Sequence, residues 1–250
     1  MRPSRILIVN ADDFGLSDGV NRGIVQAHDY GVVTSASMMV HKPATAQAAA
    51  LARDRPLLSL GLHIDVGEWR YENGCWLASY ERVSQNDPLA LKAAVTEQID
   101  IFRDLTGADP THLDSHQHAH KRDPLRSVLN ELAFKLGVPL RHFHPDVSYC
   151  GDFYGQDEKG QPLAERLTAP FLINIIAKLR DGVTELACHP AAELDFQSSY
   201  YQERMAELQV LCSPVVHRAI VRSGVTLTSF ADDLSLPQRQ TVPSARSRQQ

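Results

Sequence analysis

The sequence contains 250 residues, with 25 Lys and Arg against 30 Asp and Glu and a formal net charge of −5. This acidic balance excludes a generally basic nucleic-acid-binding protein, and a hydrophobic content of 43% with a charged content of 22% excludes a disordered or fibrous chain. No stretch approaches the roughly 20 apolar residues that cross a bilayer, and the N-terminus lacks the long apolar core of a signal peptide. We therefore predict a cytoplasmic protein with no membrane span and no nucleic-acid partner.

Short apolar runs alternate with stretches that carry helix start and stop signals along most of the chain. The first run, 5–10, reads R-I-L-I-V-N and is rich in β-branched residues, as in a strand buried on both faces. Ser17 then caps a helix that Gly31 ends. Strands are predicted at 5–10, 34–40, 58–64, 111–114, 139–143, 183–188 and 225–228. Helices are predicted at 17–30, 43–53, 89–105, 124–136, 170–180, 199–211 and 214–223.

This order of elements predicts an α/β fold with a parallel sheet. About seven strands favour a closed or nearly closed (β/α) barrel over an open three-layer sheet. The alternation breaks at 66–88 and at 145–168, which are predicted to be long irregular loops. We expect residues 1–235 to form a single catalytic (β/α)-barrel domain and the polar residues 236–250 to be a disordered tail.

Histidine is the residue type with an unusual distribution, because six of the 11 histidines lie between residues 112 and 144. Clustered imidazoles near carboxylates are typical of a metal or acid–base site, since imidazole is a good ligand and titrates near neutrality. Barrel enzymes place their reacting groups at the carboxyl ends of the strands, so polar residues at those positions are the candidates. Four predicted strands end in such residues: Asp12 and Asp13, His63 and Asp65, the segment 112–120, and His189.

Each candidate also has a structural interpretation. Asp12 and Asp13 are consistent with turn and capping residues ahead of the next helix. His63 and His189 are consistent with hydrogen-bonded histidines at strand ends, and the segment 116–120 with a solvated loop. Against this, alternate residues of an extended segment point the same way and can present two imidazoles to one ion. The adjacent carboxylates also predict that, without a metal, one of the two has a raised pKa.

Four motifs, in this order, resemble those of the YdjC-like carbohydrate deacetylases, which include chitooligosaccharide deacetylases and relatives from hopanoid biosynthesis. They are A-D-D-F-G-L-S at 11–17, G-L-H at 61–63, T-H-L-D-S-H-Q-H-A-H at 111–120 and C-H-P at 188–190. The resemblance implies a (β/α) barrel related to that of the polysaccharide deacetylases and a divalent metal, Mg²⁺ or Zn²⁺. It also implies hydrolysis of the N-acetyl group of an amino sugar, an N-acetylglucosamine-type oligosaccharide or glycoconjugate, with release of acetate.

The resemblance also implies roles for individual residues. Asp13, His63 and His116 match the metal ligands of the family, Asp12 matches the catalytic base, and His189 matches the histidine that acts as the acid. The chemistry of these residue types agrees, because two imidazoles and one carboxylate leave positions open on a metal for water and a substrate carbonyl. The metal would then stabilise the oxyanion, while the acid protonates the departing amine.

Further residues are predicted around these five. Asp114 is suited to orienting a ligand imidazole. His118 and His120 are assigned to contacts behind the ligands or with substrate, with His120 as the reserve ligand in place of His116. Trp69 and Tyr154, in the two irregular stretches, are suited to stacking on sugar rings and are equally consistent with contacts between the subunits of a homo-oligomer.

Two other functions compete with deacetylation. A metal-dependent phosphoester hydrolase would use the same ligands, but it predicts more Lys and Arg at the strand ends than Arg70 and Arg141 supply. A metal-stabilised sugar-binding protein without turnover would leave Asp12 and His189 without a role. The carbohydrate deacetylase is therefore the preferred prediction.

Overall fold

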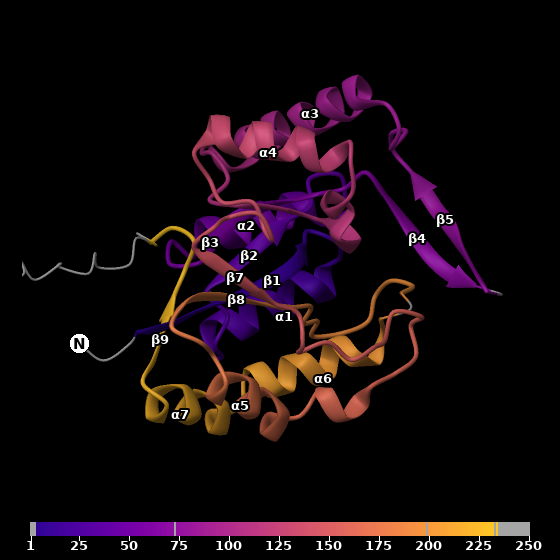
Figure 1. Cartoon of the computed structure of the whole chain (residues 1–250). Coiled ribbons are helices and arrows are strands. Elements are labelled where there is room, and N and C mark those ends of the chain that lie inside the picture. Colours follow the sequence, from indigo (N-terminus) through magenta and orange to yellow (C-terminus); the bar gives the residue numbers. More distant parts are fainter. Residues whose placement is uncertain (1–3, 73, 199, 233, 235–250) are drawn as a thin grey trace, which may run out of the picture.

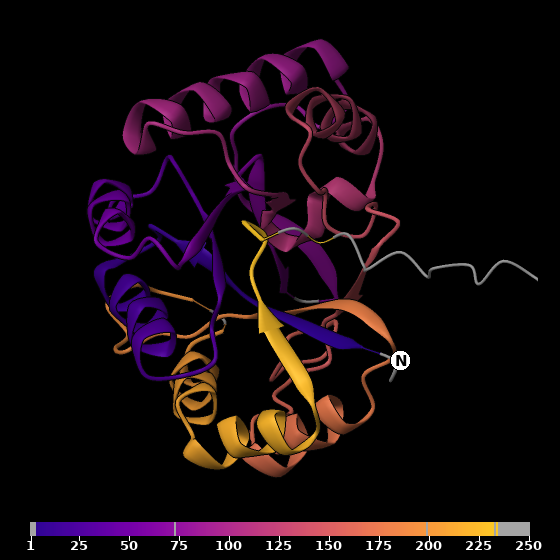
Figure 2. The same cartoon turned by 90° about the vertical axis from the view of Figure 1, so that its left-hand side faces the viewer.

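The computed structural model describes residues 4–72, 74–198, 200–232 and 234. Its main sheet has seven parallel strands in the order β6-β3-β2-β1-β8-β7, with β9 paired to β1 beside this path. The sheet curls, and the helices cover its outside (Figures 1 and 2), so the predicted (β/α) barrel is confirmed in the form of a half-barrel. The strands of this sheet are β1 (Arg5–Phe14), β2 (Ser35–Met38), β3 (Ser59–Ile64), β6 (Leu113–Ser115), β7 (Val147–Cys150), β8 (Gly182–Cys188) and β9 (Val225–Thr228).

Strand β1 lies at the centre of the sheet. It pairs with β8 along one edge and shares its other edge between β9, which pairs with its first four residues, and β2, which pairs with it from Asn10 onward. The apolar run is buried because strands flank it on both sides and helices cover the sheet. The strand continues to Phe14, so Asp12 and Asp13 lie inside it rather than after it.

The helices begin and end close to the predicted positions. Helix α1 (Asp18–Asp29) follows Ser17, whose side chain accepts a hydrogen bond from the first turn. Helix α3 (Pro88–Thr106) ends at Gly107, which has a φ of 75°, a left-handed conformation that favours glycine. The other helical segments are α2 (Thr45–Arg53), η1 (His116–Lys121), α4 (Leu125–Leu136), η2 (Ala164–Arg166), α5 (Ala169–Ala177), α6 (Gln202–Leu211) and α7 (Pro214–Arg222).

One predicted strand is misplaced. Residues 139–143 contribute only an isolated bridge between Leu140 and Leu113, and the strand that pairs with β8 is β7, which lies inside the segment 145–168 that was predicted to be irregular. The physical reason is that β7 lies at the edge of the sheet and is only partly buried, so its sequence V-S-Y-C has no apolar run. The barrel is therefore not closed by a continuous ladder between Leu140 and β7.

The stretch 66–88, also predicted to be irregular, forms an antiparallel hairpin of β4 (Gly67–Glu72) and β5 (Cys75–Glu81). The hairpin extends beyond the carboxyl ends of the parallel strands (Figure 1). Because most of its side chains are exposed, its sequence lacks the alternation of a half-buried strand. The signal that could have predicted it is the dipeptide Asn73-Gly74, which is typical of two-residue hairpin turns.

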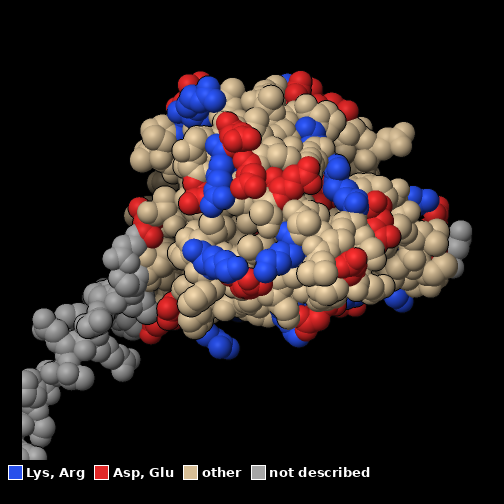
Figure 3. Space-filling model, turned by 90° about the horizontal axis from the view of Figure 1, so that it is seen from above, with Lys and Arg blue, Asp and Glu red and all other residues tan. Residues whose placement is uncertain are grey.

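Other sequence predictions concern the tail, membrane and nucleic acid. Residues 236–250, predicted to be a disordered tail, lie outside the described residues. Across the described ranges, no helix combines the length and the apolar character needed to span a bilayer. On the face that carries α3 and α4, basic and acidic side chains are interspersed (Figure 3) and form pairs such as Lys92 with Glu131 at 2.9 Å. The basic side chains on this face are thus not gathered into one patch, and the absence of a nucleic-acid partner stays a prediction.

Candidate metal and catalytic site

Three predicted metal ligands from three strand ends meet at one point. Asp13 Oδ1 lies 3.4 Å from His63 Nε2 and 3.2 Å from His116 Nδ1, and the ligand atoms of the three residues all lie within 4.8 Å of one another. Asp13 has a φ of 70° and lies within an irregularity in the pairing of β1 with β2, between Ala11 and Phe14. Neighbouring side chains of a regular strand point to opposite faces, so this irregularity lets both Asp12 and Asp13 reach the site.

The donor atoms of this triad fit a divalent cation. Asp13 Oδ1 is buried and receives no well-directed hydrogen bond from the described residues, although two imidazoles lie beside it. His63 Nδ1 lies 2.8 Å from Asp114 Oδ1, a hydrogen bond that orients the ring so that Nε2 faces Asp13. The predicted orienting contact of Asp114 is therefore present. A buried carboxylate oxygen without a donor, next to two imidazole nitrogens, is the arrangement that a cation completes.

A buried guanidinium lies behind the triad. Arg141 binds both oxygens of Asp12, with Nη1 2.6 Å from Oδ2 and Nη2 2.7 Å from Oδ1. The same side chain contacts Asp114 Oδ2 at 2.8 Å and Glu185 Oε1 at 2.7 Å. Ser37 Oγ donates a further hydrogen bond to Asp114 Oδ2 at 2.8 Å. Asp12 and Asp114 are thus fixed in place before any substrate arrives.

The two adjacent aspartates both have lowered pKa values, so the prediction that one of them is raised was wrong. Burial raises the pKa of Asp13, but Arg204, whose Nη2 lies 2.6 Å from Oδ2, holds it well below its ordinary value. Burial likewise opposes ionisation of Asp12, and Arg141 outweighs it. Each carboxylate has its own guanidinium, which the sequence pattern of two acids did not reveal.

A second set of contacts surrounds His189, on the other side of Asp12. His189 Nε2 lies 3.7 Å from Asp12 Oδ2, and the backbone N–H of His189 donates to Glu207. Tyr200 also donates its hydroxyl hydrogen to Glu207, and the Tyr154 ring stacks on Tyr200 at 4.4 Å, with its centroid 5.4 Å from the His189 ring. Burial lowers the pKa of His189 to about 4 and raises that of Glu207 to about 8.

The remaining predicted residues lie around the triad rather than in it. Trp69 is held to η1 by its backbone, since its main-chain N–H donates to Gln117 Oε1 at 2.8 Å. His118 and His120 face a different cluster, and His120 Nδ1 lies 2.6 Å from Ser115 Oγ. Tyr154, as described above, lies beside His189.

Five charged residues of the site were not predicted as part of a deacetylase site, and one of them, Arg141, was considered only for a phosphoester hydrolase. Glu68 Oε2 lies 3.6 Å from His116 Nε2, and Arg141, Glu185, Arg204 and Glu207 are buried. A signal existed for the last two, because Arg204 and Glu207 occupy the face of α6 that also carries Leu208 and Leu211. A charged pair inside an apolar helical stripe indicates a buried polar partner. Glu185 gives a similar signal within an otherwise apolar strand.

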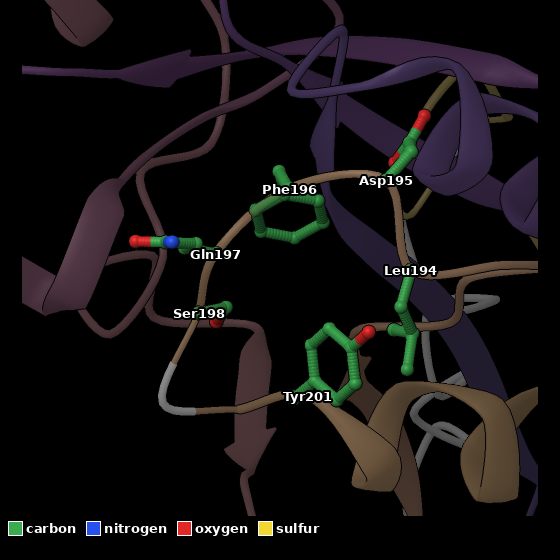
Figure 4. Close-up of a pocket in the computed structure, with 6 residues that line it drawn as sticks. All are labelled: Leu194, Asp195, Phe196, Gln197, Ser198 and Tyr201. Atoms are coloured by element: carbon green, nitrogen blue, oxygen red, sulfur yellow. The ribbon is translucent and has the colours of Figure 1, made fainter.

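A hollow lies on the loop between β8 and α6. Figure 4 shows its lining residues, which include Asp195, Phe196 and Tyr201. The loop is anchored because Asp195 Oδ2 accepts the N–H of Gly19 at 2.8 Å, and the Arg204 guanidinium lies 5.5 Å from the Phe196 ring. The hollow is therefore linked to the Asp13 carboxylate through Arg204.

Arg204→Met is expected to destabilise the protein by about 3–5 kcal/mol, because it leaves the buried Asp13 carboxylate without its guanidinium partner. A divalent cation should reduce this loss, since it supplies positive charge to the same carboxylate. Chemical denaturation with and without added Zn²⁺ measures both effects. Arg22→Met, which breaks an exposed pair with Glu193, is the control and should cost less than about 1 kcal/mol. Equal losses for the two variants would contradict the structural role of Arg204.

Sequence and structure comparisons place this chain among proteins of related architecture. A sequence profile described as YdjC-like protein matches residues 6–222. The carbohydrate deacetylase of Geobacillus stearothermophilus is 36% identical over 91% of this chain and 98% of its own length. The chitooligosaccharide deacetylase of Salmonella schwarzengrund is 33% identical over 91% of this chain and 99% of its own length.

Solved structures support the same architecture. A putative cellobiose-phosphate cleavage protein of Enterococcus faecalis has a TM-score of 0.72 at 26% identity, covering 91% of this chain and 98% of that one. A family 4 carbohydrate esterase from Streptomyces lividans has a TM-score of 0.54 at 12% identity, covering 91% and 92%. The second likeness concerns the fold alone. The curled sheet with outer helices is thus a known scaffold for carbohydrate esterases.

Proposed function

The chain belongs to the YdjC-like protein family, and we propose that it is a metal-dependent carbohydrate deacetylase. In this proposal it hydrolyses the N-acetyl group of an amino sugar, of the N-acetylglucosamine type, and releases acetate. The observation that carries the proposal is the meeting of Asp13, His63 and His116 at ligand distance, with Asp12 and His189 beside them.

Asp13, His63 and His116 are the residues that would hold the cation. When bound there, a divalent cation would polarise the amide carbonyl and stabilise the charge that develops on its oxygen. Two imidazoles and one carboxylate favour a borderline transition metal such as Zn²⁺ over Mg²⁺, which prefers oxygen ligands. Zn²⁺ is therefore the cation that we propose for this site.

Asp12 is the proposed base for the attacking water. Arg141 fixes both of its oxygens, at 2.6 and 2.7 Å, and Asn10 Nδ2 donates to Oδ1 at 2.9 Å. Since Arg141 keeps the pKa of Asp12 low, the carboxylate is ionised at neutral pH and can accept a proton. The same low pKa makes it a weak base, so the proton needs an onward acceptor.

His189 is the proposed acceptor and donor of that proton. Because burial lowers the pKa of His189 to about 4, its ring is neutral at pH 7 and must gain a proton before it can act as an acid. Its Nε2 lies 3.7 Å from Asp12 Oδ2, within reach of a small movement. The water oxygen bonds to the carbonyl carbon, the C–N bond breaks, and the proton taken by Asp12 leaves on the amine through His189. Glu207 positions His189 by accepting its backbone N–H.

Trp69→Ala and Tyr154→Ala are each expected to raise KM for a chitooligosaccharide by about 2- to 10-fold, with little change in kcat. The reason is that ring stacking contributes about 0.5–1.5 kcal/mol beyond its buried area. Steady-state acetate release measures the effect. Trp76→Ala is the matched control, because Trp76 is 58% exposed on β5 and contacts Tyr71. Unchanged KM values in both variants would remove the sugar-stacking role.

The experiment that tests the proposed function is a comparison of substrates. The Zn²⁺-loaded protein is incubated with N-acetylglucosamine oligomers of increasing length and, separately, with an aryl phosphate. Acetate release from an acetamido sugar, without phosphate release, is the expected result. Phosphate release alone would favour the phosphoester hydrolase, and saturable sugar binding without either product would favour the sugar-binding protein.

A further inference from the structure

Three histidines that the proposed reaction does not use form a second cluster of ligands. His118 and His120 belong to η1, and His142 follows the single bridge that joins Leu140 to β6. Ligand nitrogens of the three histidines all lie within 4.8 Å of one another. Their ring centroids are 5.1 Å apart for His118 and His142, 5.4 Å for His120 and His142, and 5.9 Å for His118 and His120.

Each of these rings keeps one buried nitrogen that has no hydrogen-bond partner among the described residues. The atoms are His118 Nδ1, His120 Nε2 and His142 Nε2. On two of the rings the other nitrogen is held, since His120 Nδ1 lies 2.6 Å from Ser115 Oγ and His118 Nε2 lies 3.1 Å from the Tyr149 hydroxyl. Metal-binding histidines use such a second hydrogen bond to fix the ring. A buried polar atom without a partner is unfavourable, so three imidazole nitrogens of this kind in one cluster favour a shared ligand.

The backbone is also held in an uncommon conformation around the cluster. Gln117, His118 and His142 have φ values of 50°, 53° and 68°. The left-handed region is unfavourable for a residue other than glycine, and such residues persist where other interactions compensate. Two of the three histidines are therefore positioned at a cost in backbone energy.

We propose that His118, His120 and His142 bind a Zn²⁺ ion at a site separate from the one at Asp13. Three imidazole donors without a carboxylate suit Zn²⁺ and disfavour Mg²⁺ and Ca²⁺, which take oxygen ligands. Zn–N bonds of about 2.0–2.1 Å in tetrahedral geometry require nitrogens about 3.4 Å apart, so small side-chain rotations complete the site. The ion would join η1 to the segment that carries Arg141, and so support the guanidinium that fixes Asp12.

The test uses the full chain and measures metal content. Metal-depleted wild-type protein is titrated with Zn²⁺ against a chromogenic chelator, and two tightly bound equivalents per chain are expected. A variant with Asp13→Asn and His116→Asn, which disables the first site, should keep one equivalent. Adding His142→Asn to that variant should remove it. Co²⁺ gives an independent readout, because its visible absorption in the double variant should disappear when His142 is replaced.

Controls make each outcome decisive. His217→Asn in the double variant should keep the bound equivalent, because His217 is exposed on α7. If circular dichroism shows that His142→Asn unfolds the protein, His118→Asn replaces it with the same expected loss. No equivalent in the folded double variant, or an equivalent that survives both histidine substitutions, would overturn the proposal. One equivalent in the wild type that the double variant keeps would count against the first site instead. Since metal content is measured rather than acetate, the result is independent of the proposed deacetylase activity.

Discussion

Asp13→Asn is expected to lower kcat/KM for acetate release by about 10³-fold or more, which corresponds to about 4 kcal/mol of transition-state stabilisation. Asn has nearly the same size but no charge, and the carboxylate is the anionic member of the triad with His63 and His116. Its loss weakens cation binding and, with it, the stabilisation of charge on the amide oxygen. Calorimetric titration with Zn²⁺ and an acetate assay measure the two effects on the same protein.

Asp65→Asn is the matched control for that substitution. Asp65 is also a buried aspartate at the end of a parallel strand, but its partners are Tyr80, Arg82 and Lys42, at 2.9, 2.8 and 3.1 Å. The control variant should lose stability and still bind the cation at the triad. An Asp13→Asn protein with wild-type cation affinity and acetate release would contradict the role of Asp13.

Asp12→Asn is expected to lower kcat by about 10²- to 10⁴-fold while cation affinity stays nearly unchanged, because the amide cannot accept the proton of water. This prediction separates two roles that the geometry allows, since Asp12 also lies within 4.8 Å of ligand atoms of His63 and Asp114. If Asp12 is only the base, its replacement leaves the metal bound. If Asp12 is a ligand, its replacement lowers the metal content. Steady-state kinetics and metal content of the purified variant, measured together, distinguish them.

His189→Gln supplies the comparison for the Asp12 result. The variant should lose activity on an N-acetyl sugar, whose amine needs a proton to depart, and should retain most of its activity on an aryl acetate, whose phenolate leaves without one. Asp12→Asn should lose activity on both substrates. If His189→Gln, like Asp12→Asn, lost as much activity on the aryl acetate as on the N-acetyl sugar, both residues would act in the attack of water.

The sequence predicted the buried strands well because their apolar content reports burial directly. Strand β1, enclosed on both sides by other strands, reads as a continuous apolar run. The edge strand β7 and the exposed hairpin of β4 and β5 bury little, so neither leaves an apolar pattern. Residues 139–143 were predicted to form a strand because apolar residues surround Arg141. The Arg141 side chain is itself buried, and it forms ion pairs with Asp12 and Glu185.

The candidate site was predictable where topology alone positions the residues. Parallel strands bring their carboxyl ends together, which was enough to expect the polar strand-end residues near one another. The choice of Asp13, His63 and His116 among them came from the family resemblance, and their ligand atoms lie within 4.8 Å of one another. Arg204 and Glu207 come from α6, where their place in the apolar stripe indicates burial but not their partners, because those depend on how the helix packs on the sheet. The pKa prediction for the adjacent aspartates failed for the same reason, because it lacked the two guanidinium partners.

Anomalous X-ray diffraction from crystals of the Zn²⁺-loaded protein would test most directly the claim that Asp13, His63 and His116 hold a cation together. The expected result is a zinc peak bonded to an Asp13 oxygen and to one nitrogen of each histidine, about 2.0–2.2 Å from each ligand atom. A fully loaded crystal whose zinc peaks all lie away from Asp13 would contradict the account.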